Sequence, residues 1–548
     1  MVAAFAAPAV PTSDKLRGGY YTPGPIARFL AEWVSAAGPN LLEPSCGDGA
    51  ILGQLVAHRP DGSVTGVELS ALEARAARAN VPAATVIAKD LFAWFSSSQC
   101  GAWDGVAGNP PFIRFQHWKE ELRDRAFDLM RSAGLRPTRL TNAWVPFSVA
   151  ATLALRDGGR VGLVLPAELM QVTYAAELRA FLVDTYTELT AVAFRKLLFD
   201  GVLQEVVLLL GVRGDGPASI RVVEVDDADA LPSQPARVTK VAHAPALLHD
   251  REKWTRYFLA PDEIDALRTV RRATGIGVLG EVAEVDVGVV TGRNAFFVLK
   301  PSEADRIGVR GHCVPLVSKS AHVRGIRLTS REFDALKRDD ARCLLLAVSD
   351  ELELSANKAL RRYVEEGEAA GVHLGYKCSI RKKWWVAPSV WTPDAFLLRQ
   401  IYDHPRIISN DAAATSTDTI HRVRVSTELD PRLLAAASIN SATFAFSEVM
   451  GRSYGGGVLE LEPREAEALP FPSQAALESS DLDIDLVERL TRAGRLLEAL
   501  EHVDCALLLD GLRIQPELVA RLRNVWFVLR DRRLARGRSA PNERRLAA

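Results

Sequence analysis

Cysteine is scarce in this sequence, with 6 residues in 548, and no two of them form a CxxC pair. Isolated cysteines argue against a disulfide framework and a structural zinc site, so we expect reduced thiols, no metal and a cytoplasmic location. No apolar run approaches ~20 residues, so neither a transmembrane helix nor a membrane partner is expected. The formal net charge is only −1, so a surface for a polyanion has to be a local patch.

The chain is too long for a single core, so two or three domains are expected. Residues 1–13 are rich in Ala and Pro and lack a basic n-region, which indicates a disordered leader. The expected domains are an α/β domain over residues 14–215, a mixed α+β domain over 245–475 and a helical, basic segment over 480–548. Gly, Asp, Pro and Ser between residues 211 and 245 mark the first boundary.

Short apolar runs alternate with helical stretches in the first domain, which predicts a parallel, doubly wound sheet covered on both faces. The expected strands are Leu41–Leu42, Ser63–Glu68, Thr85–Ala88, Gly105–Ala107, Arg160–Leu165 and Val206–Val212. The expected helices between them are Pro25–Ala37, Ala50–Ala57, Ala71–Asn80 and Trp144–Arg156.

The first expected strand ends in a glycine turn that starts a helix, Glu43-Pro44-Ser45-Cys46-Gly47-Asp48-Gly49. The turn has neither G-x-G-x-x-G spacing nor the lysine of a phosphate loop, which disfavours nucleotide triphosphate binding. Ligands of such sheets lie at the carboxyl ends of the strands, where glycines let the backbone approach them. An acid just before the turn suits a cationic ligand, although an ordinary strand–helix turn has the same pattern.

The next two expected strands also end in acids. Glu68 lies about 20 residues after the glycine turn, a position from which an acid typically binds ribose hydroxyls. Asp90, followed by Leu91, can accept a hydrogen bond from an adenine amino group while the leucine covers the ring, or it can simply cap a helix. The order of these acids along the sheet is specific, whereas each acid alone is not.

The fourth expected strand is followed by Asn109-Pro110-Pro111-Phe112. The Asn109 side-chain oxygen and the Pro110 carbonyl can accept hydrogen bonds from an exocyclic amine. The prolines aim both acceptors rigidly, because they fix φ and lack an N–H. Accepting these bonds pulls a conjugated nitrogen toward sp3 geometry and makes it a better nucleophile, while Phe112 can stack on the base. A plain Asn-Pro-Pro turn is the alternative.

The order of these motifs resembles the S-adenosylmethionine-dependent adenine-N6 DNA methyltransferases, in particular the TaqI-type gamma class of bacterial modification enzymes. Gly19-Tyr20-Tyr21-Thr22-Pro23 is similar to a motif that precedes the glycine turn in that class. The resemblance implies a Rossmann-like methyltransferase domain followed by a target-recognition domain. Asn109 in place of Ser favours adenine over cytosine, and Phe112 departs from the more usual Tyr by one hydroxyl.

The resemblance also implies roles for individual residues. S-adenosylmethionine would be bound by Thr22, Glu43, Ser45, Gly47, Asp48, Glu68, Asp90 and Leu91. Asn109, Pro110 and Phe112 would act on the target base. Phe199, in the segment Leu198-Phe199-Asp200-Gly201, would stack on the second face of that base, and a core position is the alternative for this residue.

Basic and aromatic residues interleave in the second half of the chain. The DNA-binding candidates are Arg293, Asn294, Arg381, Lys382, Lys383 and Trp384. Phosphates attract such cations, and Arg and Asn also read base edges in the major groove. The tail over residues 521–545 is strongly basic as well, and a solvated charged face is the alternative for each run.

Together these features predict a site-specific enzyme that flips an adenine out of duplex DNA and methylates N6, as in a restriction–modification system. Flipping is expected because the amino group lies inside the base stack. We expect a monomer, with any cognate restriction endonuclease acting separately. The alternatives are methylation of RNA or of a protein glutamine, against which the long second half argues, and an inactive binding module, against which the intact acids and Asn109 argue.

Overall fold

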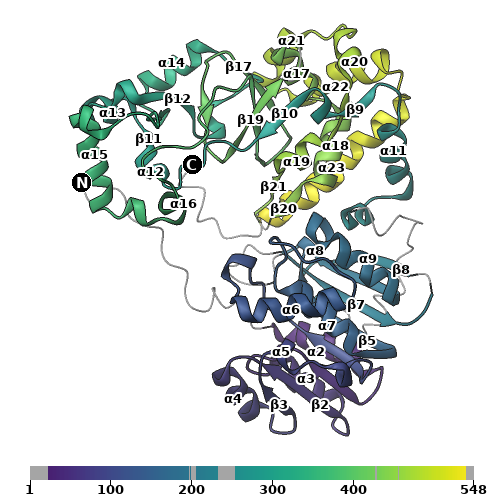
Figure 1. The fold of residues 1–548 in the computed structure, drawn as a ribbon. Helices are drawn as coiled ribbons and strands as arrows, with labels where there is room; N and C mark the ends of the chain where they lie inside the picture. The colour runs from purple at the N-terminus through teal and green to yellow at the C-terminus, as the bar shows by residue number, and fades with distance from the viewer. Residues whose placement is uncertain are drawn as a thin grey trace. The chain divides into compact units, whose positions relative to one another are not determined.

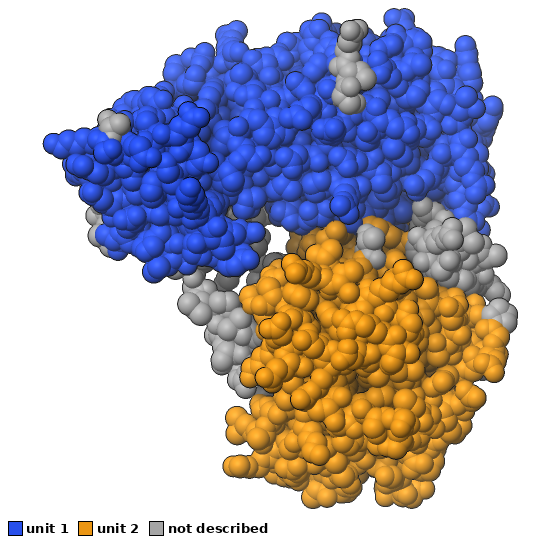
Figure 2. All heavy atoms as spheres, viewed as in Figure 1, with its two compact units in different colours: residues 1–10, 261–451, 458–530 blue, residues 11–260, 452–457, 531–548 orange. Residues whose placement is uncertain are grey.

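The computed structural model describes residues 22–196, 198, 205–216, 218–231, 253–425, 429–454 and 456–538. The chain forms two compact units (Figure 2). We call the orange unit of Figure 2 (unit 2 in its key) the first unit; it comprises residues 11–260, 452–457 and 531–548. The second unit, blue in Figure 2 and unit 1 in its key, comprises residues 1–10, 261–451 and 458–530. The expected leader over residues 1–13 lies outside the described residues.

The first unit is built on an eight-stranded sheet of order β3-β2-β1-β4-β5-β7-β6-β8 (Figure 1). Its strands are β1 (Asn40–Glu43), β2 (Ser63–Glu68), β3 (Thr85–Ala88), β4 (Trp103–Gly108), β5 (Leu155–Pro166), β6 (Tyr186–Phe194), β7 (Val206–Arg213) and β8 (Ser219–Val225). All six expected strands are present, and the α/β class is confirmed. The expectation of an all-parallel sheet is wrong for β7, which pairs antiparallel with β5 and β6. Side chains alternate between the two faces of a strand whichever way it runs, so the sequence pattern does not reveal this reversal.

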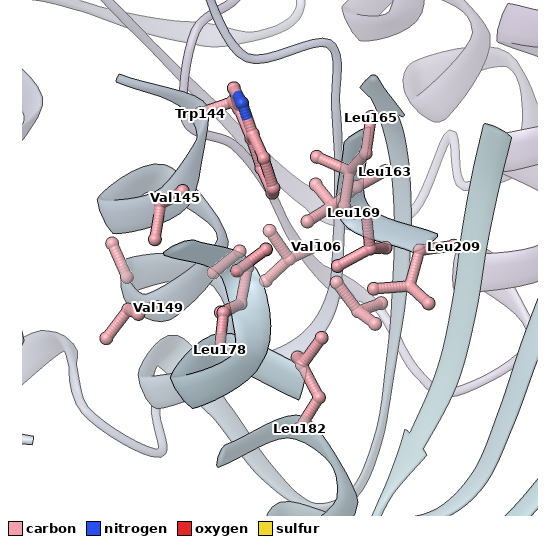
Figure 3. Packing of buried hydrophobic residues seen from close by; sticks show 14 of the residues in the cluster. Val106, Trp144, Val145, Val149, Leu163, Leu165, Leu169, Leu178, Leu182 and Leu209 are labelled. Carbon is pink, nitrogen blue, oxygen red and sulfur yellow. The ribbon is translucent and has the colours of Figure 1, made fainter. Parts of the chain in front are cut away.

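Helices cover both faces of this sheet, as the doubly wound class requires. They are α2 (Gly24–Ser35), α3 (Ala50–His58), α4 (Ala71–Asn80), α5 (Leu91–Trp94), α6 (Glu120–Ser132), α7 (Trp144–Ala154), α8 (Glu168–Gln171) and α9 (Ala176–Thr185). Along β5, Leu163 and Leu165 pack with Val106 and Trp144 in one core (Figure 3), whereas Val164 belongs to the core on the other face. Burial on both faces explains why these strands read as nearly continuous apolar runs.

The second unit contains a five-stranded sheet of order β10-β19-β15-β17-β13 and a four-stranded sheet of order β11-β14-β12-β18. The strands are β10 (Ala283–Asp286), β11 (Val298–Leu299), β12 (Cys313–Val317), β13 (Arg327–Leu328), β14 (Leu344–Leu346), β15 (Ala395–Leu398), β17 (Ile407–Asn410), β18 (Thr415–Ser416) and β19 (Ile420–Val425). Its helices include α11 (Pro261–Arg271), α12 (Asn294–Phe297), α13 (Pro301–Ile307), α14 (Ser330–Arg338), α15 (Lys358–Ala369), α16 (Tyr376–Ser379), α17 (Pro431–Ala437), α18 (Ser441–Met450), α21 (Ile484–Arg492), α22 (Leu496–Val503) and most of α23 (Pro516–Arg538). The unit is mixed α+β, as expected.

The compact units do not follow the expected boundaries. Strand β8 lies beyond residue 215, where the catalytic domain was expected to end, and it pairs with β6 in the same sheet. The helical segment expected as a separate part from residue 480 belongs to the second unit up to residue 530. Residues 452–457 and 531–538, which follow the second unit's main segment in sequence, are part of the first unit.

No single helix in the described part of the chain has both the length and the apolar composition needed to cross a membrane. Helices α17 and α18 satisfy that test only as a pair, and the pair is bent by 76°. Nearly all residues of α18 are buried within the protein.

Candidate active site

The candidate site lies where the strand order of the sheet reverses. Strand β1 lies between β2 and β4, so the connections on its two sides run in opposite directions and leave a crevice at the carboxyl ends of β1 and β4. Leu42 pairs with Val106, which brings the ends of these two strands side by side. The Ser45 hydroxyl donates a hydrogen bond to the Asn109 carbonyl at 3.3 Å. The structure thus joins the glycine turn to the Asn-Pro-Pro-Phe segment.

The glycine turn is held open by the Glu68 carboxylate. The Gly47 amide donates to Glu68 Oε2 at 3.0 Å, and the Ser70 amide donates to Oε1 at 2.7 Å. Gly47 and Gly49 have φ values of 51° and 94°, in the left-handed region where a side chain would be strained. Glu68 therefore positions the backbone of the turn, and each of its oxygens retains a further lone pair for a ligand.

Glu43 is the most deeply buried acid of the site, with 2% of its surface exposed. Its Oε2 atom is buried, and no residue in the described part of the chain hydrogen-bonds it. Burial raises the pKa of Glu43 well above its ordinary value, and the nearby charges of Glu68 and Asp48 raise it further. A buried acceptor without a donor is costly unless a ligand supplies one. The site therefore fits a ligand with a cationic donor, such as the ammonium group of S-adenosylmethionine.

Asp90 caps helix α5, because its Oδ1 atom accepts from the Ala93 amide at 3.0 Å. Burial raises the pKa of Asp90 above its ordinary value. The Leu91 side chain is buried in the core, with 3% of its surface exposed, so the expected contact of this side chain with an adenine ring is not seen in the structure. Leu69, directly after Glu68, is 58% exposed and was missed in the sequence. Its position in the sequence, a leucine directly after a strand-end acid, could have identified Leu69 as a candidate to pack against a flat ring.

Replacing Asp90 separates its capping role from a role in ligand binding. Serine is also a good N-cap, so Asp90→Ser should preserve the melting temperature, whereas Asp90→Ala should lose about 1 kcal/mol of stability. If the carboxylate accepts from the adenine of S-adenosylmethionine, both variants should weaken cofactor binding by about 1–3 kcal/mol in calorimetry. Full cofactor affinity in Asp90→Ser would reduce this residue to a helix cap.

Asn109 is half-buried at the end of β4, and its Nδ2 atom donates to Thr22 Oγ1 at 3.2 Å. Since the amide is planar, this bond directs Oδ1 to the opposite side. Thr22 lies just before α2, so the motif expected N-terminal to the glycine turn does reach the site. Its first residues, Gly19, Tyr20 and Tyr21, lie outside the described residues.

Phe112 is half-buried and packs against the edge of both cores of the first unit. The next residue, Ile113, is anchored because its carbonyl accepts from the Ala143 amide at 2.9 Å. The backbone directly after Phe112 is thus fixed in place. Phe199, the expected partner on the second face of the base, lies outside the described residues.

A polar cluster beyond the Asn-Pro-Pro-Phe segment was missed in the sequence. The Asn142 side-chain amide donates to Glu168 Oε2 at 3.2 Å and to the Tyr174 hydroxyl at 2.9 Å, and that hydroxyl also bonds Glu168. Burial and the charge of Glu168 raise the pKa of Tyr174 beyond its ordinary range. Asn142 directly precedes Ala143, whose amide anchors Ile113. The cluster therefore stabilises the C-terminal end of the Asn-Pro-Pro-Phe segment.

The glycine-rich segment near residue 455 supplies a second missed contact to the first unit. The Ser453 amide donates to Gln171 Oε1 at 2.6 Å, and its hydroxyl donates to Glu205 Oε1 at 3.1 Å. Farther along the chain, the Arg533 guanidinium donates to the Gly457 carbonyl at 2.5 Å. No sequence pattern indicates that this segment belongs to the first unit.

The DNA-binding candidates of the second unit divide into buried and exposed residues. Trp384 is only 7% exposed, and its indole donates to Glu368 at 3.0 Å, so the expectation that it contacts DNA is corrected to a core role. Arg381 donates to the Val290 carbonyl, and Lys383 donates to the Asp350 carbonyl at 2.6 Å, so both tie loops together. The cause is that the basic–aromatic pattern does not reveal which side of a loop faces solvent.

Three candidates remain accessible to a ligand. Lys382 and Asn294 are exposed, and Arg293 is half-buried at the start of α12. No group of three or more His, Cys, Asp and Glu side chains placed to hold a metal ion occurs among the residues that the structure describes.

An eight-stranded sheet with this strand order, a buried acid and glycine turn at its switch point, and an Asn-Pro-Pro-Phe segment beside them define an S-adenosylmethionine-dependent methyltransferase. Residues 5–214 match the model of the N-6 DNA Methylase family, and residues 251–508 match the model of the C-terminal domain of the Type II methyltransferase M.Eco57I. Together the two matches span most of the chain, which belongs to the N6-adenine DNA methyltransferases of restriction–modification systems.

Known proteins of this kind resemble the chain over most of its length. Type II methyltransferase M.XamI of Xanthomonas campestris pv. amaranthicola is 24% identical over 480 residues, which cover 83% of this chain and 85% of that protein. Type II methyltransferase M.AccI of Acinetobacter calcoaceticus is 19% identical over 465 residues, which cover 81% of this chain and 83% of that protein. The cryo-EM structure of the DrdV–DNA complex aligns with a TM-score of 0.44 at 12% identity, covering 75% of this chain and 49% of that one.

Proposed function

We propose that this enzyme flips a single adenine out of duplex DNA and transfers a methyl group to its N6 atom at the carboxyl ends of β1 and β4. The observation that carries the proposal is the contact between the two motifs, in which Ser45 of the glycine turn bonds the Asn109 carbonyl. A cofactor held by the turn and a base held by the Asn-Pro-Pro-Phe segment would meet at this point. Proximity and alignment of the two reactants then supply much of the acceleration.

The cofactor would be held by acids already placed for it. S-adenosylmethionine, when bound, supplies an activated methyl group on its sulfonium. Glu43 would accept from the ammonium group, because none of the described residues bonds its buried Oε2 atom. Glu68 would accept from the ribose hydroxyls with the lone pairs that Gly47 and Ser70 leave unused.

Asn109 would orient the target amine. With Nδ2 bonded to Thr22, the Oδ1 atom can accept one proton of the adenine amino group, and the Pro110 carbonyl can accept the other. The two bonds would place the nitrogen lone pair toward the cofactor. Phe112 would stack on one face of the base, and Phe199 is proposed for the other.

Methylome sequencing of cells that express the chain tests this function directly. We expect N6-methyladenine at one short DNA sequence in nearly every copy, and none with the Asn109→Ala variant. Methylation of RNA or of protein glutamine without any DNA signal would contradict the proposal. We also propose that the enzyme is a monomer of the gamma class acting in the cytoplasm, with a separate endonuclease as its functional counterpart, and that the second unit selects the sequence.

Base flipping predicts a fluorescence change at the target position. A duplex with 2-aminopurine in place of the target adenine should brighten when the enzyme binds, because the base leaves the stack. Phe112→Tyr should keep this signal, whereas Phe112→Leu should lose about 1–3 kcal/mol of base stacking and slow methylation. An unchanged signal with the wild-type enzyme on its mapped site would rule out flipping.

A further inference from the structure

An exposed apolar group stands out on the second unit. Leu374, Tyr376 and Ile380 are 72%, 73% and 63% exposed and lie within seven residues of one another. They occupy helix α16 and the residues on either side of it, a group that we call the α16 loop, residues 371–385. Large apolar side chains gathered at this density on a surface indicate a binding partner.

The α16 loop is firmly held by the side chains between its exposed residues. Val372 and Cys378 are fully buried, and Trp384 anchors the loop by its bond to Glu368. Arg381 donates a hydrogen bond to the carbonyl of Val290, the residue directly before the Thr291-Gly292-Arg293-Asn294 turn. The exposed side chains therefore project from a fixed backbone.

The turn at residues 291–294 lies directly against the α16 loop, as helices α12 and α16 do in Figure 1. A Cβ atom on Gly292 would lie 2.8 Å from Cβ of Lys377, so only glycine allows this approach. Gly292 also has a φ of 80°, which disfavours any side chain. The exposed side chain of Asn294 is thereby placed on the same local surface as the loop.

The charge of this surface selects the partner. Residues 371–385 contain four Lys and Arg and no Asp or Glu, but Lys383 pairs with Glu353 at 3.3 Å and Arg381 bonds the Val290 carbonyl. Lys377 and Lys382 are exposed, and the Lys377 ammonium lies 5.7 Å from the centre of the Tyr376 ring. A surface with cations around apolar side chains matches duplex DNA, in which phosphates flank a stack of apolar bases.

We infer that the α16 loop is a DNA wedge, in which Tyr376 and Ile380 insert between base pairs while Lys377 and Lys382 hold the flanking phosphates. This inference rests on the proposed function, since it takes duplex DNA as the substrate. Apolar wedges of this kind unstack a base step and kink the duplex. Specificity then depends partly on how easily the contacted step deforms.

The test uses the full-length enzyme and a duplex with the recognition sequence mapped by methylome sequencing. Tyr376→Ala combined with Ile380→Ser should weaken duplex binding about tenfold. Lys382→Ala should instead lower the slope of log affinity against log salt by about 1. Leu497→Ser, at a 53% exposed leucine of α22 in the same unit, is the matched control and should change neither quantity.

Placing 2-aminopurine at each position outside the target adenine locates the wedge. The wild-type enzyme should brighten one such position, and the double variant should lose that signal while it retains S-adenosylmethionine binding in calorimetry. Unchanged affinity and fluorescence in a double variant that still methylates adenine would overturn the wedge and leave the proposed function intact. A double variant that only converts a dimer to a monomer would also overturn it, by making the loop a self-association surface. Failure of the wild-type enzyme to methylate DNA would refute the proposed function itself.

Discussion

Asn109→Ala should lose methyl transfer by at least ~10²-fold while it binds S-adenosylmethionine and duplex DNA normally. The side chain is polar and half-buried, so its loss should leave the fold unchanged. The effect should appear in the single-turnover rate, because the lost bond orients the amine during reaction and contributes little to ground-state binding. Rapid-quench assays with radiolabelled cofactor measure this rate.

Two further variants test the oxygen and the nitrogen of the Asn109 amide separately. Asn109→Asp keeps an acceptor oxygen and should retain more activity than Asn109→Ala. Thr22→Val removes one partner of Nδ2 without changing the size of the side chain, and it should cause an intermediate loss because the amide is held less firmly. Near wild-type rates for Asn109→Ala would show that the amine is oriented by other groups.

Glu43 should make cofactor affinity depend on pH. In the folded protein without ligand, burial raises the pKa of Glu43 above its ordinary value of 4.5. A cationic ammonium group binds the carboxylate form, so affinity should increase with pH until the raised pKa is passed, and binding below that pH should release a proton. Calorimetry in two buffers with different ionisation enthalpies measures this proton.

The matched variant is Glu43→Gln. It should lose at least about 2 kcal/mol of cofactor affinity and the pH dependence together. The free energy of unfolding of Glu43→Gln, in contrast to its cofactor affinity, should not decrease at high pH. A carboxyl whose folded pKa exceeds its unfolded pKa holds its proton longer in the folded state, so stability falls as pH rises from 4.5 through the raised value. At pH 8, Glu43→Gln should therefore melt at a temperature equal to or above that of the wild type, and a strongly destabilised variant would contradict this account.

The order of the first four strands could be predicted because each ends in a motif with a distinct chemical role. Strand β6 was missed, since Tyr186–Phe194 follows α9 directly with no turn residues to mark its start. Strand β8 was taken for part of a boundary, because a half-buried edge strand carries polar residues such as Arg221 and Glu224. Direction, unlike burial, leaves no periodic signal, so the reversal of β7 was not predictable.

The candidate site could be predicted as a set of residues but not as a set of contacts. Spacing placed Glu68 at a strand end, but only the structure shows both of its oxygens engaged by backbone amides. The deep burial of Glu43 also depends on packing from several elements distant in sequence. In the second unit, three consecutive residues of one loop have different environments. Trp384 lies in the core, Lys383 bonds a neighbouring loop and Lys382 faces solvent. The sequence does not reveal which of them is buried.

The return of residues 452–457 and 531–538 to the first unit affects how the protein is made. A ribosome delivers the eight strands of the sheet early but must add the whole second unit before Arg533 can bond Gly457. From residue 260 to residue 531 this takes roughly 15–50 s at ordinary elongation rates. The last contacts of the methyltransferase unit therefore form after the second unit has been synthesised. A nascent chain that has not reached Arg533 lacks its contact with Gly457, so we expect the first unit to reach its final structure only late in synthesis.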